Sequence, residues 1–191
     1  MSTTSSTENI RMGTCRVLYA GVDLGYTSGG VEVTVATTTH ETKVDQFGDT
    51  VANEYIMGRS ITIKAPLIET TLENMAQLMP GSTLVTDNTD PSKPKKKVVV
   101  TSGTGISLLE RAKEMVLHPI AKAEDDHSED LVIPLSATAG AMNFSYKYDD
   151  ERVFECEFKG YPQADGTLFI YGDKSVSASG TSSTSTSGSD A

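Results

Sequence analysis

Three scarcities limit what this chain of 191 residues can be, and the first is cysteine. Cys15 and Cys156 lie far apart without metal-site spacing, so we expect two reduced thiols and no cysteine-based metal site. Long apolar runs are the second scarcity: stretches such as residues 131–133 are far too short to cross a bilayer. No basic start followed by an apolar stretch indicates a secretory signal. We therefore expect a chain of cytoplasmic origin without a membrane segment.

Basic residues are the third scarcity. The chain has 16 Lys and Arg against 26 Asp and Glu, which gives a formal net charge of −10. A protein that binds nucleic acid normally has the opposite balance, because Lys and Arg neutralise phosphates. The acidic balance therefore argues against DNA binding. Ordinary solubility accounts for it, and so does a surface past which DNA must slide.

The side-chain patterns of enzymes are also missing. The three histidines are scattered, and no phosphate-binding glycine loop or nucleophile elbow is present. His127 lies among Asp125, Asp126 and Glu129, a group compatible with a cation site. However, the run lacks the ligand spacing of a calcium loop, and clustered loop carboxylates are usually just solvated. The sequence therefore predicts no catalytic residue, no cofactor and no metal.

Composition divides the chain into three parts. Residues 1–9 and 174–191 are polar, rich in Ser and Thr, and nearly free of large apolar side chains. Such segments bury too little surface to offset their ordering entropy, so we expect a flexible N-terminal arm and a disordered C-terminal tail. Residues 10–173 are long enough for one domain with a hydrophobic core, and we expect a single β domain there.

Alternation of apolar and polar residues predicts most of this domain to be strand. Valine occupies every second position of residues 31–35, and residues 56–67 return with the same period after a loop at 45–49. Together these segments predict an unusually long hairpin. Cys156 alternates with Phe154 and Phe158, so we expect it in the core. Further strands are expected at residues 16–21, 98–100, 131–135, 142–148, 152–158 and 167–171.

One helix is expected, at residues 71–79. Thr70 and Glu73 match a capping box, the apolar residues share one face, and a Pro-Gly pair follows. Residues 106–117 fit either a helix or an extended strand. Many strands, one helix and no strand–helix alternation predict a mainly-β sandwich or barrel with one flanking α-helix.

A group of four lysines, one before and three after Pro94, lies in the polar segment 87–97. It has no aromatic neighbours on which bases could stack. We expect a solvated loop, and the alternative is a contact with an acidic surface on a neighbouring subunit. The group consists of Lys93, Lys95, Lys96 and Lys97.

Several segments carry a resemblance to a known family. They are residues 24–35 (LGYTSGGVEVTV), 44–48 (VDQFG), 58–78 (GRSITIKAPLIETTLENMAQL), 112–119 (AKEMVLHP), 131–134 with 142–144, and 158–173 (FKGYPQADGTLFIYGD). Each is weak alone, but they follow one another in order over most of residues 14–173. Together they resemble the tail tube (major tail) proteins of long-tailed bacteriophages.

This resemblance implies a structural virion protein and not an enzyme. It implies a β-sandwich with one flanking helix, six of which close into a ring whose inner strands form a continuous barrel. Rings would stack through loops and terminal arms into the tail tube, a conduit for DNA ejection. The implied partners are further copies of the chain and other tail proteins at the tube ends, while genomic DNA passes without specific binding. The implied location is the virion tail, assembled in the host cytoplasm.

The long hairpin is the part that such a ring needs, because large β-barrels leave a channel and their closure removes exposed sheet edges. The face expected to turn toward the subunit core comprises Val31, Val33, Val35, Ile61, Ile63 and Leu67. The candidates for the lumen are Glu32, Thr34, Ser60, Thr62 and Lys64. We expect Lys64 to pair with an acidic neighbour or to turn toward a subunit seam. The alternation breaks near residues 37–41, so the assignment stops there.

The loop at the far end of the hairpin supplies candidates for contacts between rings. These are Asp45, Gln46, Phe47, Gly48 and Asp49.

Two other classes of protein remain open. One is a different phage structural subunit, such as a distal tail or capsid decoration protein. The other is a non-enzymatic β binding module. Concentration-dependent polymerisation into tubes would distinguish a tube subunit from both. Tubes of contractile tails and type VI secretion systems share the fold, and the sequence does not separate these from a non-contractile tail.

Overall fold

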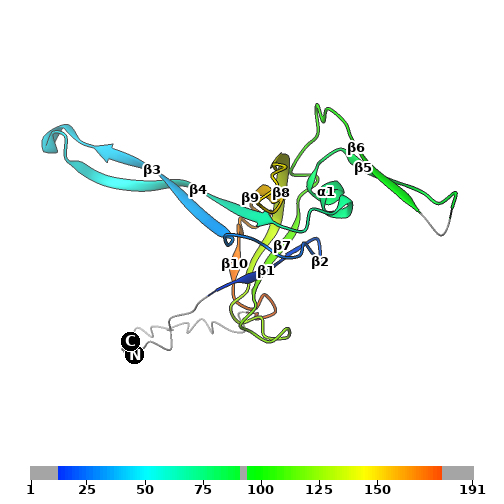
Figure 1. Cartoon of the computed structure of the whole chain (residues 1–191). Helices are drawn as coiled ribbons and strands as arrows, with labels where there is room; N and C mark the ends of the chain where they lie inside the picture. Colours follow the sequence, from blue (N-terminus) through cyan, green and yellow to red (C-terminus); the bar gives the residue numbers. More distant parts are fainter. Residues whose placement is uncertain (1–12, 91–93, 178–191) are drawn as a thin grey trace.

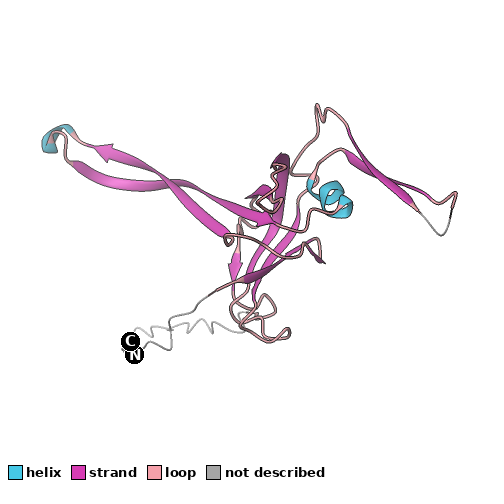
Figure 2. Ribbon diagram, in the orientation of Figure 1, coloured by secondary structure: helices cyan, strands magenta, loops and turns pink. Residues whose placement is uncertain are grey.

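The computed structural model describes residues 13–90 and 94–177. The expected arm at residues 1–9 and most of the expected tail at 174–191 lie outside the described residues. Within them, ten strands and one α-helix form a mainly-β, antiparallel structure, which confirms the expected fold class (Figure 1, Figure 2). In this part of the chain no helix has the length and apolar character needed to span a membrane.

Eight strands belong to one sheet, in the order β2-β1-β7-β8-β9-β4-β3 with β10 beside β8. The remaining two strands form a separate hairpin. The bounds in the large sheet are β1 (Cys15–Tyr19), β2 (Val22–Asp23), β3 (Glu32–Lys43), β4 (Val51–Leu67), β7 (Lys113–Pro119), β8 (Leu131–Asn143), β9 (Phe154–Gly160) and β10 (Ile170–Tyr171). Those of the hairpin are β5 (Ser82–Asp87) and β6 (Lys95–Val100).

Strand β8 folds the large sheet into two layers. Its residues 131–136 pair with β7, and its residues 136–143 pair with β9. A register shift lies between Thr138 and Met142, where Gly140 has φ +76°. A Cβ on Gly140 would lie 2.8 Å from Cδ of Pro80, so a larger residue would clash as well as strain the backbone. The bulge lets one strand serve both layers, with β1, β2, β7 and β10 in one and β3, β4 and β9 in the other.

The core lies between these layers. Phe158 of β9 packs against Tyr19 of β1 with ring centroids 5.2 Å apart, and Ile61 and Ile63 of β4 join the same cluster. Cys156 is buried there too, as expected, and burial raises the pKa of its thiol to about 11. This cysteine therefore stays protonated at neutral pH and acts as a packing residue.

Replacing Phe158 with alanine should lower the free energy of unfolding by about 3–5 kcal/mol. The ring is fully buried between the layers, so its loss removes apolar contacts from both and leaves a cavity. Urea unfolding of the unassembled subunit measures the effect. Lys159→Ala, at the exposed next position, should change stability by no more than about 0.5 kcal/mol. A loss below about 1 kcal/mol for Phe158→Ala would contradict packing of the two layers through this ring.

The helix α1 (Leu72–Leu78) lies where expected, but its cap is Thr71, whose side chain accepts a 3.1 Å hydrogen bond from the Asn74 amide. The expected cap Thr70 is therefore wrong by one residue, since its hydroxyl instead accepts from Arg152. Asn74 Nδ2 donates to the Leu24 carbonyl oxygen at 3.0 Å, and Leu78 is buried in the core. These contacts fix the helix over one end of the sandwich.

The structure decides one strand prediction that was left open and corrects others. Residues 106–117, open between helix and strand, contain the start of β7 from Lys113. The separate strands expected at 131–135 and 142–148 are one strand, β8, which ends at Asn143. Its small residues at 136–141 hide the alternation that would have revealed continuity. Strand β5 was not expected, and its partner β6 begins at Lys95, so three of the loop lysines lie on a strand. One of them, Lys96, pairs with Glu73 at 2.6 Å.

Two hairpins project from the body in different directions (Figure 1). The longer consists of β3 and β4, paired from Glu32–Lys64 out to Lys43–Val51. Nearly every side chain in β3 is exposed, as are the first ten residues of β4. The shorter is β5–β6, which forms a sheet of its own and whose outer residues are equally exposed. Among the described residues, no hydrophobic layer covers the outer part of either projection.

Candidate functional site

The register of the long hairpin sorts its side chains onto two faces. Glu32 stands opposite Lys64, Thr34 opposite Thr62 and Ala36 opposite Ser60. Val33 stands opposite Ile63 and Val35 opposite Ile61. Because side chains alternate along a strand, the first set shares one face and the second the other. All five lumen candidates therefore lie on a single polar face, as expected from the sequence pattern: Glu32, Thr34, Ser60, Thr62 and Lys64.

The polar face continues across the neighbouring strand. Thr62 is opposite Lys159 and Lys64 is opposite Glu157, and Glu155 follows on the same side of β9. These three residues were not among the lumen candidates expected from the sequence. Their alternation with the buried Phe154, Cys156 and Phe158 is the signal that would have found them.

Opposite charges alternate on this face. Lys64 Nζ lies 3.4 Å from Glu32 Oε2, which confirms the expected pairing of Lys64 with an acidic neighbour. Both groups are exposed, so the pair adds little to stability. A shallow depression of about 680 Å³ lies here, lined by Glu32, Lys64, Glu155 and Glu157 among others. It holds three carboxylates and one ammonium group, which favours a surface that repels anions.

The opposite face is apolar, and part of it lacks cover. Ile61, Ile63 and Leu67 are buried, as expected. Val33 and Val35 lie on this face too, as expected, but they are 38% and 45% exposed in the single chain. These two valines are exposed because β3 is the last strand of the sheet and extends past the opposite layer (Figure 1).

Further exposed apolar residues lie nearer the tip of the hairpin, and because they are consecutive they are divided between its two faces. A register shift lies between Thr38 and Thr39, which agrees with the break in alternation near residues 37–41. Beyond it Tyr55, Ile56 and Met57 are all more than half exposed. Exposed apolar groups gathered on one element mark interaction surfaces more often than isolated ones do.

The tip holds all five of the loop candidates. Residues Asp45–Phe47 form one turn of 3-10 helix, and Gly48 follows with φ +61°. Lys43 reaches across the turn to Asp49 at 3.5 Å. Phe47 is exposed, and so are the other four candidates: Asp45, Gln46, Gly48 and Asp49.

Two strand edges lie open in the layer that carries the polar face. Among the described residues β3 pairs only with β4, and residues 137–143 of β8 pair only with β9. An open edge presents unpaired backbone donors and acceptors that another strand can use. This layer therefore offers one free edge at each side.

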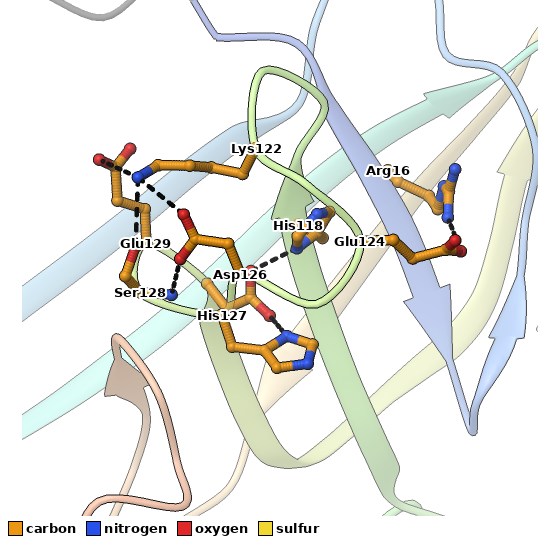
Figure 3. A network of polar contacts seen from close by, with 9 residues as sticks. Arg16, His118, Lys122, Glu124, Asp126, His127, Ser128 and Glu129 are labelled. Carbon is orange, nitrogen blue, oxygen red and sulfur yellow. Dashed lines mark hydrogen bonds and ion pairs between the residues drawn. The ribbon is translucent and has the colours of Figure 1, made fainter.

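A second group of polar residues lies at the end of the body opposite to the helix, where β7 leads into its connection with β8. Its members are His118 of β7 and, from the connection, His127 and Asp130. Figure 3 labels the two histidines. His118 Nδ1 lies 2.6 Å from Asp130 Oδ1, and His127 Nδ1 lies 2.8 Å from Asp130 Oδ2. In the sequence His127 lies among Asp125, Asp126 and Glu129, whereas in the structure its ring contacts Asp130.

Three other carboxylates of this connection, those of Glu124, Asp126 and Glu129, have basic or hydroxyl partners. Lys122 lies within 3.2 Å of Asp126 and 3.3 Å of Glu129, and Arg16 lies 3.0 Å from Glu124 (Figure 3). Hydrogen bonds from Ser128, followed by the contact with Lys122, lower the pKa of Asp126 to about 2. The sequence suggested a loop of solvated carboxylates, but these side chains form ion pairs and hydrogen bonds within the protein.

Neither the known protein families nor the curated proteins include a match to this sequence. The candidate sites therefore depend on the geometry described above and on the sequence resemblance.

Proposed function

We propose that this chain is a structural subunit that assembles into stacked hexameric rings, forming a phage tail tube through which DNA passes. The observation that supports the proposal most directly is the projecting hairpin with one polar and one apolar face. A hairpin of this length exposes apolar side chains that the body does not cover. A neighbouring copy of the chain would cover them.

The open edges support a ring as the form of assembly. The layer β8-β9-β4-β3 contains four antiparallel strands, so the strands at its two edges run in opposite directions. Edge β3 of one copy can therefore pair antiparallel with edge β8 of the next. Such a contact is head-to-tail, and it closes into a ring if its rotation closes. Six subunits, the number that the resemblance implies, would join their layers into one barrel.

The polar face supports the role as a conduit. In such a barrel the apolar face turns toward the subunit cores, and the face with Glu32 and Lys64 lines the channel. Its ammonium groups lie beside carboxylates, as in the Lys64–Glu32 pair, so a passing phosphate meets no isolated cation. DNA that is not held by fixed cations can slide.

Raising the concentration of the purified chain should produce rings and then tubes. Analytical ultracentrifugation and negative-stain electron microscopy would follow this transition. A compact monomer at every concentration, with no tail protein able to nucleate polymerisation, would contradict the proposal. Isolated rings that never stack would instead favour a distal tail or capsid decoration subunit.

A further inference from the structure

The group of His118, His127 and Asp130 has the composition of a metal site. Each residue offers a ligand atom that lies within 4.8 Å of those of the other two. Two imidazole nitrogens and one carboxylate oxygen form a donor set that zinc accepts readily. Magnesium and calcium prefer sites made of oxygen alone, so the set favours a transition metal.

The sheet positions two of these residues. Leu117 of β7 is opposite Leu131 of β8, and continuing this register by one residue places His118 opposite Asp130. Both are buried, on the layer face that turns away from the core. The Asp130 carbonyl oxygen accepts a 2.7 Å hydrogen bond from the Gly172 amide, which fixes its backbone. Folding therefore assembles these two groups without help from an ion.

His127 completes the group from the connecting loop. Its side chain is 53% exposed, whereas that of Asp130 is only 3% exposed. Ligands of a tetrahedral zinc ion lie roughly 3.3 Å apart, so the two nitrogen–oxygen distances of 2.6 and 2.8 Å must open by about 0.5–0.7 Å. The exposed loop position of His127 allows the His127–Asp130 distance to open, whereas the His118–Asp130 distance must open between two buried side chains.

The surroundings favour a cation. A cavity of about 370 Å³ borders the group, with room for water as a further ligand. Besides Asp130, its charged lining has three carboxylates against two basic side chains: Glu114, Glu124 and Asp173 against Arg16 and Lys174. Both basic groups are already paired, Arg16 with Asp23 and Glu124, and Lys174 with Glu114.

We propose that His118, His127 and Asp130 bind one divalent transition-metal ion of the zinc class. The ion is held by the Nδ1 atoms of both imidazoles and by the Asp130 carboxylate. Each imidazole is then neutral and carries its proton on Nε2. The ion joins the β7–β8 connection to the ends of two paired strands, so its role is to stabilise this end of the body. The inference does not depend on assembly into tubes.

Titration calorimetry of the untagged full chain with zinc chloride, below the concentration of assembly, tests the proposal. We expect one zinc ion per chain and a rise in the midpoint of thermal unfolding. Co²⁺ added instead should give the visible absorption of a low-symmetry site with nitrogen and oxygen ligands. Absence of saturable binding of either ion would overturn the proposal and leave a purely hydrogen-bonded group.

Variants identify the ligands. His127→Gln keeps an exposed polar side chain and should fold, yet zinc affinity should fall by at least about 100-fold, because even second-shell changes cost 10–100-fold. Asp130→Asn should have the same effect. The matched control is His40→Gln, which removes an exposed histidine from β3, outside the group, and should bind zinc as the parent does. Unchanged affinity in His127→Gln, or loss of binding in His40→Gln, would overturn the assignment.

Discussion

Tubes should fail to form from a chain in which Val33 and Val35 are both replaced by aspartate. The two valines are exposed in the single chain, so the subunit should still fold. In the proposed ring they lie against a neighbour, and each substitution would bury an unpaired carboxylate there. A cost of about 4 kcal/mol per interface would raise the concentration needed for assembly roughly 1,000-fold. Sedimentation velocity and electron microscopy across that range would measure the change.

The control for this prediction uses the same strand and the same chemistry. Thr34→Asp with Ala36→Asp places two carboxylates at the neighbouring positions, which belong to the polar face. The added charge is the same, but no carboxylate becomes buried; the loss of strand propensity is smaller than in the valine variant, because Ala36 is not a strong strand former. This control should assemble near the concentration of the parent. Equal assembly of both double variants would show that the valine face is not an interface.

The part of the fold that could be predicted from the sequence is the part with a strict local period. Alternation in residues 31–35 and 61–67 correctly predicted which side chains of β3 and β4 share a face. The apolar stripe correctly predicted helix α1. Burial of Cys156 followed from the phenylalanines on either side of it. In each case residues at a regular spacing along the chain share one environment, so a short window contains enough information.

Other features depend on distant contacts. The small residues of β8 show no alternation because the strand passes between two layers there, with Gly140 against Pro80. The exposure of Val33 and Val35 depends on where the opposite layer ends, which no pattern within β3 records.

The contacts within the histidine group also could not be predicted from the sequence. His118 and Asp130 meet because β7 and β8 pair in one register, and the sequence alone left even the secondary structure before His118 open. His127 was grouped with its nearest acidic neighbours in the chain. In the structure, hydrogen bonding and burial select Asp130 instead. Proximity in the sequence therefore identified the right loop but the wrong partner.

Tubes built from a chain with Glu32→Lys and Thr34→Lys should assemble but deliver DNA poorly. The polar face of each subunit carries Glu32, Glu155 and Glu157 against Lys64 and Lys159, which is a formal charge of −1. The two substitutions add three positive charges and reverse its sign. They also leave Lys64 without its acidic partner. If this face lines the channel, six subunits present a ring of cations to the passing phosphates.

Each phosphate held by such a cation releases counterions, which favours binding and slows passage. DNA release from particles assembled with the variant subunit, followed by dye fluorescence, should therefore be slower than from the parent. The defect should ease as salt rises, because the Debye length falls from about 10 Å at 0.1 M to about 3 Å at 1 M. Asp125→Lys with Ala121→Lys makes the same change of charge in the exposed β7–β8 connection and should release DNA normally. If both variants are equally slow, net charge and not the polar face controls delivery, and the channel assignment of Glu32 is wrong.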